Sequence, residues 1–261
     1  MSPTSLDSTQ RFSDRVADYV RYRPDYPAAL IDWLSDAHGL VPSWTVADVG
    51  AGTGISSRMF LDAGNTVFAV EPNAPMRAAA ERWLGGNPRF HAVDGSAEAT
   101  TLAAGSVDLV TARAGVSLVR RRRGAARMGA HPQAARSRRA VFWNSRLLAG
   151  SAFLEGYERL LLDYGTDYVS VAERYADEAA MRRWFGEGYR GAATFPHRQL
   201  LDFDALRGRL LSSSYAPREG DPRHAPMLAA LRTLFDATAR EGLVGFDYET
   251  RIYVGTLPAP A

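Results

Sequence analysis

The sequence predicts an α/β fold with a doubly wound, mostly parallel sheet. Short runs of β-branched and other apolar residues alternate with stretches of helical periodicity, which is the pattern of strand–helix–strand units. The first of these runs, at residues 44–49, ends in a glycine-rich turn. The chain has 261 residues, of which 46% are hydrophobic, and this is enough to bury one large core.

The predicted elements follow from periodicity and from local capping signals. Buried strands are predicted at residues 44–49, 66–70, 89–93, 106–111, 140–144 and 246–257. Helices are predicted at residues 55–63, 73–83 and 227–240, and residues 147–189 are predicted to be mostly helical. Asn73 can cap the second of these helices. Two further short helices are predicted between residues 11 and 37, separated by a kinked turn at 23–27 that contains two prolines.

The composition excludes several kinds of chemistry. The chain has no cysteine, which excludes disulfides, cysteine zinc ligands and cysteine nucleophiles. Its five histidines show no metal-ligand spacing, so no metal site is expected. No apolar run approaches the ~18 residues of a membrane span. Residues 1–10 lack the apolar segment of a signal peptide, so we expect a cytoplasmic protein that does not contact a membrane.

The net charge conceals a strong local asymmetry. All 31 basic residues are arginines, and nine of them fall in residues 113–139, which contain no acidic residue. The rest of the chain carries 22 arginines against 29 acidic residues, so the formal charge of +2 is the sum of −7 and +9. The basic character therefore belongs to one segment and does not by itself indicate a nucleic-acid-binding protein.

The glycine-rich turn joins the first predicted strand to the helix that follows it. Residues 48–54 are Asp-Val-Gly-Ala-Gly-Thr-Gly. Glycine lets the backbone approach a ligand closely, and the first amides of the next helix attract an anionic or polar group. Glu71 ends the second strand, 21 residues after Gly50, where a carboxylate can accept hydrogen bonds from both hydroxyls of a ribose. The turn is therefore a candidate cofactor site.

The Gly-x-Gly-x-Gly spacing, with Asp48 ahead of it, resembles the first motif of class I S-adenosylmethionine-dependent methyltransferases. Residues 95–98, residues 105–110 and the segment at 19–27 are similar to the small-molecule branch related to ubiquinone-biosynthesis and trans-aconitate methyltransferases. The resemblance implies a Rossmann-like fold, S-adenosylmethionine as cofactor, S-adenosylhomocysteine as product and a small-molecule methyl acceptor.

The resemblance also implies one domain over residues 1–261. We expect its parts to be an N-terminal helical cap at 1–40, a cofactor-binding half at 41–146, a helical lid at 147–190 and a C-terminal part at 191–261 that completes the sheet.

Cofactor contacts carry over from the family by position in the motifs. The methionine part of the cofactor would lie on the residues of the turn, which are Gly50, Ala51, Gly52, Thr53 and Gly54. Asp48 would anchor this turn, Glu71 with the adjacent Pro72 would bind the ribose, and Ser96 and Ala97 would flank the adenine. Ser96 stands where the superfamily often has an acid that contacts the adenine amino group. Tyr19 and Arg23 would close over the cofactor carboxylate.

The sequence gives weaker indications of the residues that contact the methyl acceptor. Asn144 and Arg146 follow the fifth strand, at the carboxyl edge where open α/β sheets bind ligands, and are candidate substrate contacts. No residue is assigned as the catalytic base. An NAD-type oxidoreductase is a further alternative, and Ile55 argues against it because a dinucleotide turn has its third glycine at a different spacing. An RNA methyltransferase that uses the arginine cluster is disfavoured because no aromatic residues interleave with the arginines.

Residues 113–139 lie where the fold needs a helix between the fourth and fifth strands, yet they show almost no hydrophobic periodicity. Codons can be chosen for residues 115–120 so that reading them with a one-base shift gives Ala-Phe-His-Trp-Phe, a sequence typical of the family. Codons for residues 131–134 can likewise be chosen so that the same shift gives Ile-Leu-Lys-Pro, which is also typical of the family. We hypothesise that two compensating frameshifts replaced this segment. The corresponding alternative function is a relative that binds the cofactor but is catalytically impaired.

Overall fold

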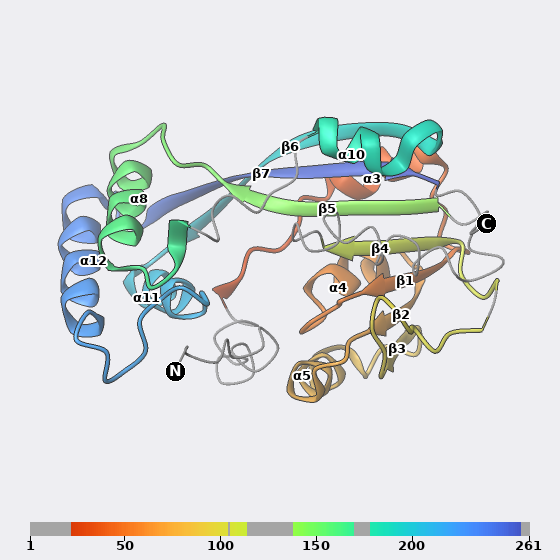
Figure 1. The fold of residues 1–261 in the computed structure, drawn as a ribbon, viewed down its shortest axis with the longest axis horizontal. Helices are drawn as coiled ribbons and strands as arrows, with labels where there is room; N and C mark the ends of the chain where they lie inside the picture. The colour runs from red at the N-terminus through yellow and green to blue at the C-terminus, as the bar shows by residue number, and fades with distance from the viewer. Residues whose placement is uncertain (1–21, 104, 114–137, 170–177, 257–261) are drawn as a thin grey trace, which may run out of the picture. The chain divides into compact units, whose positions relative to one another are not determined.

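The computed structural model describes residues 22–103, 105–113, 138–169 and 178–256 of the chain (Figure 1). The strands are β1 (Thr45–Val49), β2 (Thr66–Val70), β3 (Phe90–Val93), β4 (Leu109–Arg113), β5 (Arg138–Arg146), β6 (Tyr189–Leu201) and β7 (Val244–Gly255). The helices are α3 (Ala29–His38), α4 (Ile55–Asp62), α5 (Ala74–Leu84), α8 (Ala152–Tyr164), α10 (Glu178–Phe185), the 3-10 helix η1 (Gly186–Gly188), α11 (Phe203–Leu211) and α12 (His224–Thr238).

The seven strands form one sheet in the order β3-β2-β1-β4-β5-β7-β6. β1 pairs in parallel with β2 on one side and with β4 on the other, and the β2–β3 and β4–β5 pairs are also parallel. The strand order reverses between β1 and β4, which is the switch point where open α/β sheets bind ligands. The predicted α/β class with a doubly wound, mostly parallel sheet is confirmed.

The chain divides into two compact units, each with its own core. The first, which we call the sheet unit, comprises Asp25–Ser145, Arg174–Phe195 and Thr250–Ala261. The second, which we call the helical unit, comprises Met1–Pro24, Arg146–Glu173 and Pro196–Glu249. The expected cofactor-binding half lies in the sheet unit up to Ser145, whereas the expected lid is divided between the two units.

Strand β5 shows how the sheet unit builds its core, because its side chains alternate between the two faces. Phe142 meets Tyr26 edge to face, with 4.9 Å between the ring centroids. Val141 and Trp143 pack on the other face against Met181 and Phe185 of α10. α4 packs against β1 and β2, and α5 packs against β3, so helices cover the strands that lead into the glycine turn.

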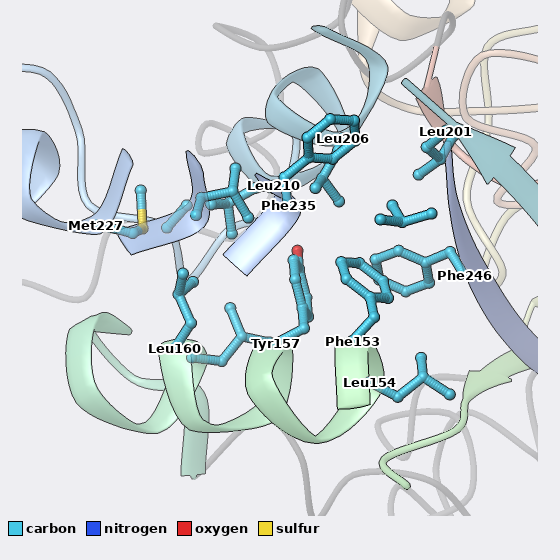
Figure 2. Close-up of a cluster of buried hydrophobic side chains, with 14 of the residues drawn as sticks. Phe153, Leu154, Tyr157, Leu160, Leu201, Leu206, Leu210, Met227, Phe235 and Phe246 are labelled. Atoms are coloured by element: carbon cyan, nitrogen blue, oxygen red, sulfur yellow. The ribbon is translucent and has the colours of Figure 1, made fainter. Parts of the chain in front are cut away.

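The helical unit has a core of aromatic and aliphatic side chains from α8, α11, α12 and β7 (Figure 2). α8 buries Phe153, Leu154, Tyr157, Leu160 and Leu161, a spacing that places them along one face of the helix. Ser151 begins this helix, since its side chain accepts a hydrogen bond from the backbone amide of Leu154 at 3.2 Å.

The sequence predicted the first half of the sheet closely. β1, α4, β2, α5 and β3 begin and end within one residue of their predicted bounds, and Asn73 caps α5 by accepting from the amide of Met76 at 3.0 Å. β6 and α11 were not predicted. β6 contains Pro196, which argues against a strand in a sheet interior, but β6 lies at the edge of this sheet, where proline is tolerated.

Strand β5 is longer than predicted and begins inside the basic segment, at Arg138 rather than at Ala140. Arg138 and Arg139 join the sheet because they pair in register with Leu109 and Val110 of β4. Arg139 is buried there, in a strand position that a parallel sheet ordinarily fills with an apolar residue. The remaining arginine-rich residues, 114–137, and the first helix of the expected N-terminal cap lie outside the described residues.

Candidate functional site

The glycine turn (residues 50–54) connects β1 to α4 at the switch point of the sheet. Gly50, Gly52 and Gly54 have φ angles of 72°, 59° and 89°, a left-handed conformation that residues with a Cβ rarely adopt. The amide of Gly50 donates to the carbonyl of Val70 in β2 at 2.8 Å, which ties the turn to the neighbouring strand. The backbone conformation of the turn is therefore a sufficient reason for glycine at these three positions.

The surroundings of these glycines differ in a way that bears on function. A Cβ on Gly54 would lie 2.7 Å from Cδ1 of Leu84, so this position is closed by helix packing. A Cβ on Gly50 would meet no atom of the described residues within 4 Å, so these residues leave open space beside the backbone there. Thr53, in the same turn, is buried, and its hydroxyl oxygen has no hydrogen-bond partner in the described structure. Open space and an unsatisfied hydroxyl are what a site for a polar ligand requires.

Glu71 bridges the glycine turn and the loop that precedes α5. Its Oε2 accepts a hydrogen bond from the amide of Gly52 at 2.8 Å, and its Oε1 accepts one from the amide of Asn73 at 2.8 Å. The side chain is 8% exposed. Each carboxylate oxygen can accept a second hydrogen bond, so Glu71 is held in one orientation and can still bind a ligand hydroxyl.

Asp48 anchors the turn from the buried side. Its Oδ2 accepts from the hydroxyls of Ser56 and Ser57, each at 2.7 Å, and its Oδ1 accepts from the hydroxyl of Thr111 at 3.1 Å. Asp48 and Thr111 are register partners on β1 and β4, whereas the two serines belong to the first turn of α4. One fully buried carboxylate thus fixes the start of α4 against two strands.

The loop after β3 carries the residues expected to flank adenine. Ser96 and Ala97 are half-buried, and Ser96 forms an isolated antiparallel bridge with Ala99. The hydroxyl of Ser96 donates to Oε2 of Glu98 at 3.0 Å, so the serine that replaces the family's acid is itself bonded to an acid. Pro72, next to Glu71, is exposed.

The remaining expected contacts include Tyr19, Arg23 and Asn144. Tyr19 lies outside the described residues. Arg23 belongs to the helical unit, where it donates to the backbone carbonyl of Ser212 at 3.2 Å. The amide of Asn144 donates to the carbonyl of Asp25 at 2.8 Å and accepts from the hydroxyl of Thr250 at 2.6 Å. This amide is therefore engaged within the sheet unit.

Arg146, the second expected substrate contact, is also engaged within the protein. It forms an ion pair with Glu158 and donates to the hydroxyl of Tyr168 at 2.7 Å. These three residues all belong to the helical unit, and the arginine side chain is 10% exposed. The interactions observed for Arg146 are those of a residue that stabilises α8 within the helical unit.

The described residues contain neither a candidate metal site nor a candidate membrane span. None of their histidine, aspartate and glutamate side chains gather in a group of three or more that could hold a metal ion. Their helices are all too short or too polar to cross a membrane.

Residues 47–129 match the family model of the methyltransferase domain, and the match begins in β1 and includes the glycine turn and Glu71. About a third of the chain is therefore similar to a methyltransferase domain. The expected resemblance is thereby confirmed at the level of the family. The match also extends to residue 129, inside the arginine-rich segment.

Sequence relatives of this methyltransferase domain have themselves not been characterised. An uncharacterized methyltransferase of Mycobacterium tuberculosis is 36% identical over 110 residues, which are 42% of this chain and 42% of the relative. An uncharacterized methyltransferase of Schizosaccharomyces pombe is 33% identical over 103 residues, or 38% of this chain and 39% of the relative. Each match thus spans about two fifths of the relative's length.

Solved structures extend the likeness of the methyltransferase fold over most of the chain. A protein of Anaeromyxobacter dehalogenans proposed to be a type II methyltransferase superimposes with a TM-score of 0.62 at 24% identity, over 91% of this chain and 99% of that one. An S-adenosylmethionine-dependent methyltransferase of Geobacter sulfurreducens, in complex with S-adenosylhomocysteine, gives a TM-score of 0.51 at 14% identity, over 95% and 97% of the two chains. These likenesses concern the fold.

Several residues of this site were not predicted from the sequence. Thr111, Ser56 and Ser57 surround Asp48, and Arg77 donates both to the backbone carbonyl of Glu71 at 2.7 Å and to the carboxylate of Asp94. The adjacency of β1 and β4 would have indicated Thr111, because the two strands place it opposite Asp48. No sequence signal pointed to Arg77.

Proposed function

We propose that this chain binds S-adenosylmethionine at the glycine turn and transfers its methyl group to a small-molecule acceptor. The observation that carries the proposal is the junction of Glu71 with Gly52, beside the open space at Gly50 and at the switch point of the sheet. The methyltransferase relatives and the complex of the Geobacter neighbour with S-adenosylhomocysteine support the choice of cofactor.

The residues of the turn fit this cofactor by their chemistry. The first amides of α4 have no partner within the helix and suit the methionine carboxylate, with the Thr53 hydroxyl as a further donor. Glu71 would accept the ribose hydroxyls with its remaining lone pairs. Ser96 and Ala97 would lie against the adenine. Asp48 would contribute indirectly, because it keeps the start of α4 in place.

When bound, S-adenosylmethionine would supply a methyl group made electrophilic by the adjacent sulfonium. The protein then has to hold the acceptor atom in line with that methyl group and to exclude water. A small-molecule acceptor is preferred over RNA because Arg77, which donates to the carbonyl of Glu71, is already paired with Asp94 and so is not available to a phosphate group.

Thermal unfolding of the purified chain tests the proposal. S-adenosylhomocysteine at 100 times its dissociation constant should add roughly 2.7 kcal/mol to the free energy of unfolding. In a domain of this size, that gain should raise Tm by about 5–10 °C. NAD at the same concentration should leave Tm unchanged, because Ile55 does not fit a dinucleotide turn. A rise with NAD alone would favour the oxidoreductase alternative, and a transition that neither ligand moves would refute the cofactor assignment.

Transfer itself needs a second measurement, namely release of S-adenosylhomocysteine from S-adenosylmethionine in the presence of pools of small acceptors. A chain that binds the cofactor but releases no product with any pool would match the impaired relative. The buried Arg139 in β5 is the observation in favour of this second candidate. The frameshift hypothesis is tested separately by the gene, since codons in residues 113–139 that cannot be read in the second frame would refute it.

A further inference from the structure

Arg209 of α11 is a buried cation in the helical unit. It is 5% exposed. Its Nε donates to the hydroxyl of Tyr248 at 3.2 Å, and its Nη1 donates to the hydroxyl of Ser213 at 3.2 Å. Both partners are neutral. Among all residues that the structure describes, none offers Arg209 a carboxylate.

Arg146, a largely buried arginine of the same unit, has different partners. Arg146 is paired with Glu158 and so has its charge neutralised within the protein. A buried guanidinium without an anion is costly, because its lost hydration is only partly replaced by neutral hydroxyls. Burial opposes the charge on Arg209, but Tyr248, Tyr215 and Tyr157 together raise the pKa of Arg209 above its usual value. The side chain therefore stays protonated and has no counter-ion among the described residues.

Tyr157 of α8 supplies a second unsatisfied group in this core. The residue is 1% exposed, and its hydroxyl has no hydrogen-bond partner in the described structure. Figure 2 shows its oxygen pointing away from the α8 backbone into the cluster. Burial is the largest cause of a raised pKa at Tyr157, and the charge of Arg209 acts against that rise. The hydroxyl thus remains a neutral donor.

Aromatic rings surround these two donors. The guanidinium carbon of Arg209 lies 5.4 Å from the centroid of the Phe246 ring. The ring of Tyr157 meets the same Phe246 ring edge to face at 4.9 Å, and Phe246 stacks on Tyr248 at 5.2 Å. The hydroxyl of Tyr248 already donates to Oε1 of Gln199 at 3.1 Å, so its proton is committed. The Arg209 guanidinium and Tyr157 are left as donors within an apolar wall.

We propose that Arg209 and Tyr157 form a binding site for the carboxylate group of a small organic ligand. A planar carboxylate matches the fork of a guanidinium, and its single negative charge balances the single charge of Arg209. A phosphate dianion would leave one negative charge buried without a partner. The aromatic wall suits an apolar body on the ligand. This inference concerns residues of the helical unit alone and does not rest on the proposed cofactor site.

Thermal unfolding at pH 7.5, with ionic strength held constant by sodium chloride, tests the site with defined probes. Sodium acetate and sodium benzoate should both raise Tm, and the rise should reach a plateau as the concentration increases. Benzoate should reach its plateau at a lower concentration than acetate, because its ring can pack against the aromatic wall. Benzamide, which is neutral and of the same shape, should not raise Tm. Inorganic phosphate should act no more strongly than chloride. The proposal is overturned if neither carboxylate raises Tm above the chloride control, or if phosphate alone does.

Two variants locate the effect. Tyr157→Phe removes a hydroxyl that has no hydrogen-bond partner among the described residues, so it should leave the Tm of the free protein within about 2 °C of the parent. It should weaken benzoate binding by about tenfold, as expected for loss of one hydrogen bond to a charged group. The matched control is Tyr164→Phe on the same helix, which should not alter benzoate binding. Unchanged benzoate affinity in Tyr157→Phe would refute the assignment of this donor. Arg209→Met, where it folds, should abolish the response to benzoate.

Discussion

The carboxylate of Glu71 and the amide of Gly52 are joined by a hydrogen bond of 2.8 Å, so the second strand of the sheet holds the turn that follows the first. The other carboxylate oxygen accepts from the amide of Asn73. Glu71 therefore has a structural role as well as its proposed role toward a ribose. A useful experiment must separate the two.

Glu71→Gln should weaken binding of S-adenosylhomocysteine more than tenfold. The neutral amide accepts through one oxygen only, and its nitrogen would face the amide hydrogen of either Gly52 or Asn73. Calorimetric titration measures the affinity, and Tm of the free protein measures the damage to the turn. Glu81→Gln, an exposed carboxylate on α5, is the control and should change neither quantity. Equal affinities in Glu71→Gln and the parent would remove Glu71 from the cofactor site.

Gly50→Ala and Gly54→Ala should fail in different ways. Both require a left-handed conformation, which costs a residue with a Cβ roughly 1–2 kcal/mol. The Cβ at position 50 meets only open space, so this variant should fold but lose affinity for S-adenosylhomocysteine. The Cβ at position 54 would meet Leu84 at 2.7 Å, so this variant should lose distinctly more stability. Urea unfolding and ligand titration of both variants distinguish the outcomes, and equal losses of stability would contradict the account.

Thr111→Val tests Asp48 as the buried anchor of the turn. The substitution keeps the shape of the side chain but removes the hydroxyl that donates to Asp48, and it should cost about 1–3 kcal/mol of unfolding free energy. Ser56→Ala should cost a similar amount, and the double variant should deviate from additivity because both hydroxyls bind one carboxylate. Ser35→Ala is the control, since that hydroxyl bonds only within α3. Full additivity in urea unfolding would show that the two contacts are independent.

The sequence predicted those parts of the fold and site that depend on local signals. The alternation of apolar runs with helical periods placed β1 to β3, and the glycine spacing with Glu71 indicated the turn. Contacts that depend on strand order were missed. Thr111 lies 63 positions from Asp48, and only the parallel pairing of β4 with β1 brings them together. β6 was missed because Pro196 contradicts an interior strand, and the sequence does not say which strand forms the edge.

His38, the last residue of α3, should make stability depend on pH. Burial, followed by the charge of Arg138, lowers the pKa of His38 below its ordinary value of 6.5. The unfolded chain therefore binds a proton that the folded chain does not, and stability should fall as pH decreases below about 6.5, with the loss complete below the folded pKa. His38→Gln should flatten Tm between pH 7.5 and 5, whereas His91→Gln, at an exposed position of β3, should retain the slope. A parent-like slope in His38→Gln would assign the dependence to another group.

Arg139→Leu should stabilise the chain although it lies in the central part of the sheet. Arg139 is 1% exposed in β5, and burial lowers its pKa from 12.5 to about 10, so the fold disfavours the charge that the side chain carries at pH 7. Burial of an ionised side chain costs several kcal/mol in lost hydration, and an apolar side chain at the same position avoids this cost. For a chain of this length, each kcal/mol raises Tm by about 2–4 °C. Arg138→Leu, at the exposed neighbouring position where the guanidinium lies 5.1 Å from the Trp44 ring, should change Tm little. A lower Tm in Arg139→Leu would show that this arginine is an adapted part of the sheet, which would weaken the interpretation of residues 113–139 as a replaced segment.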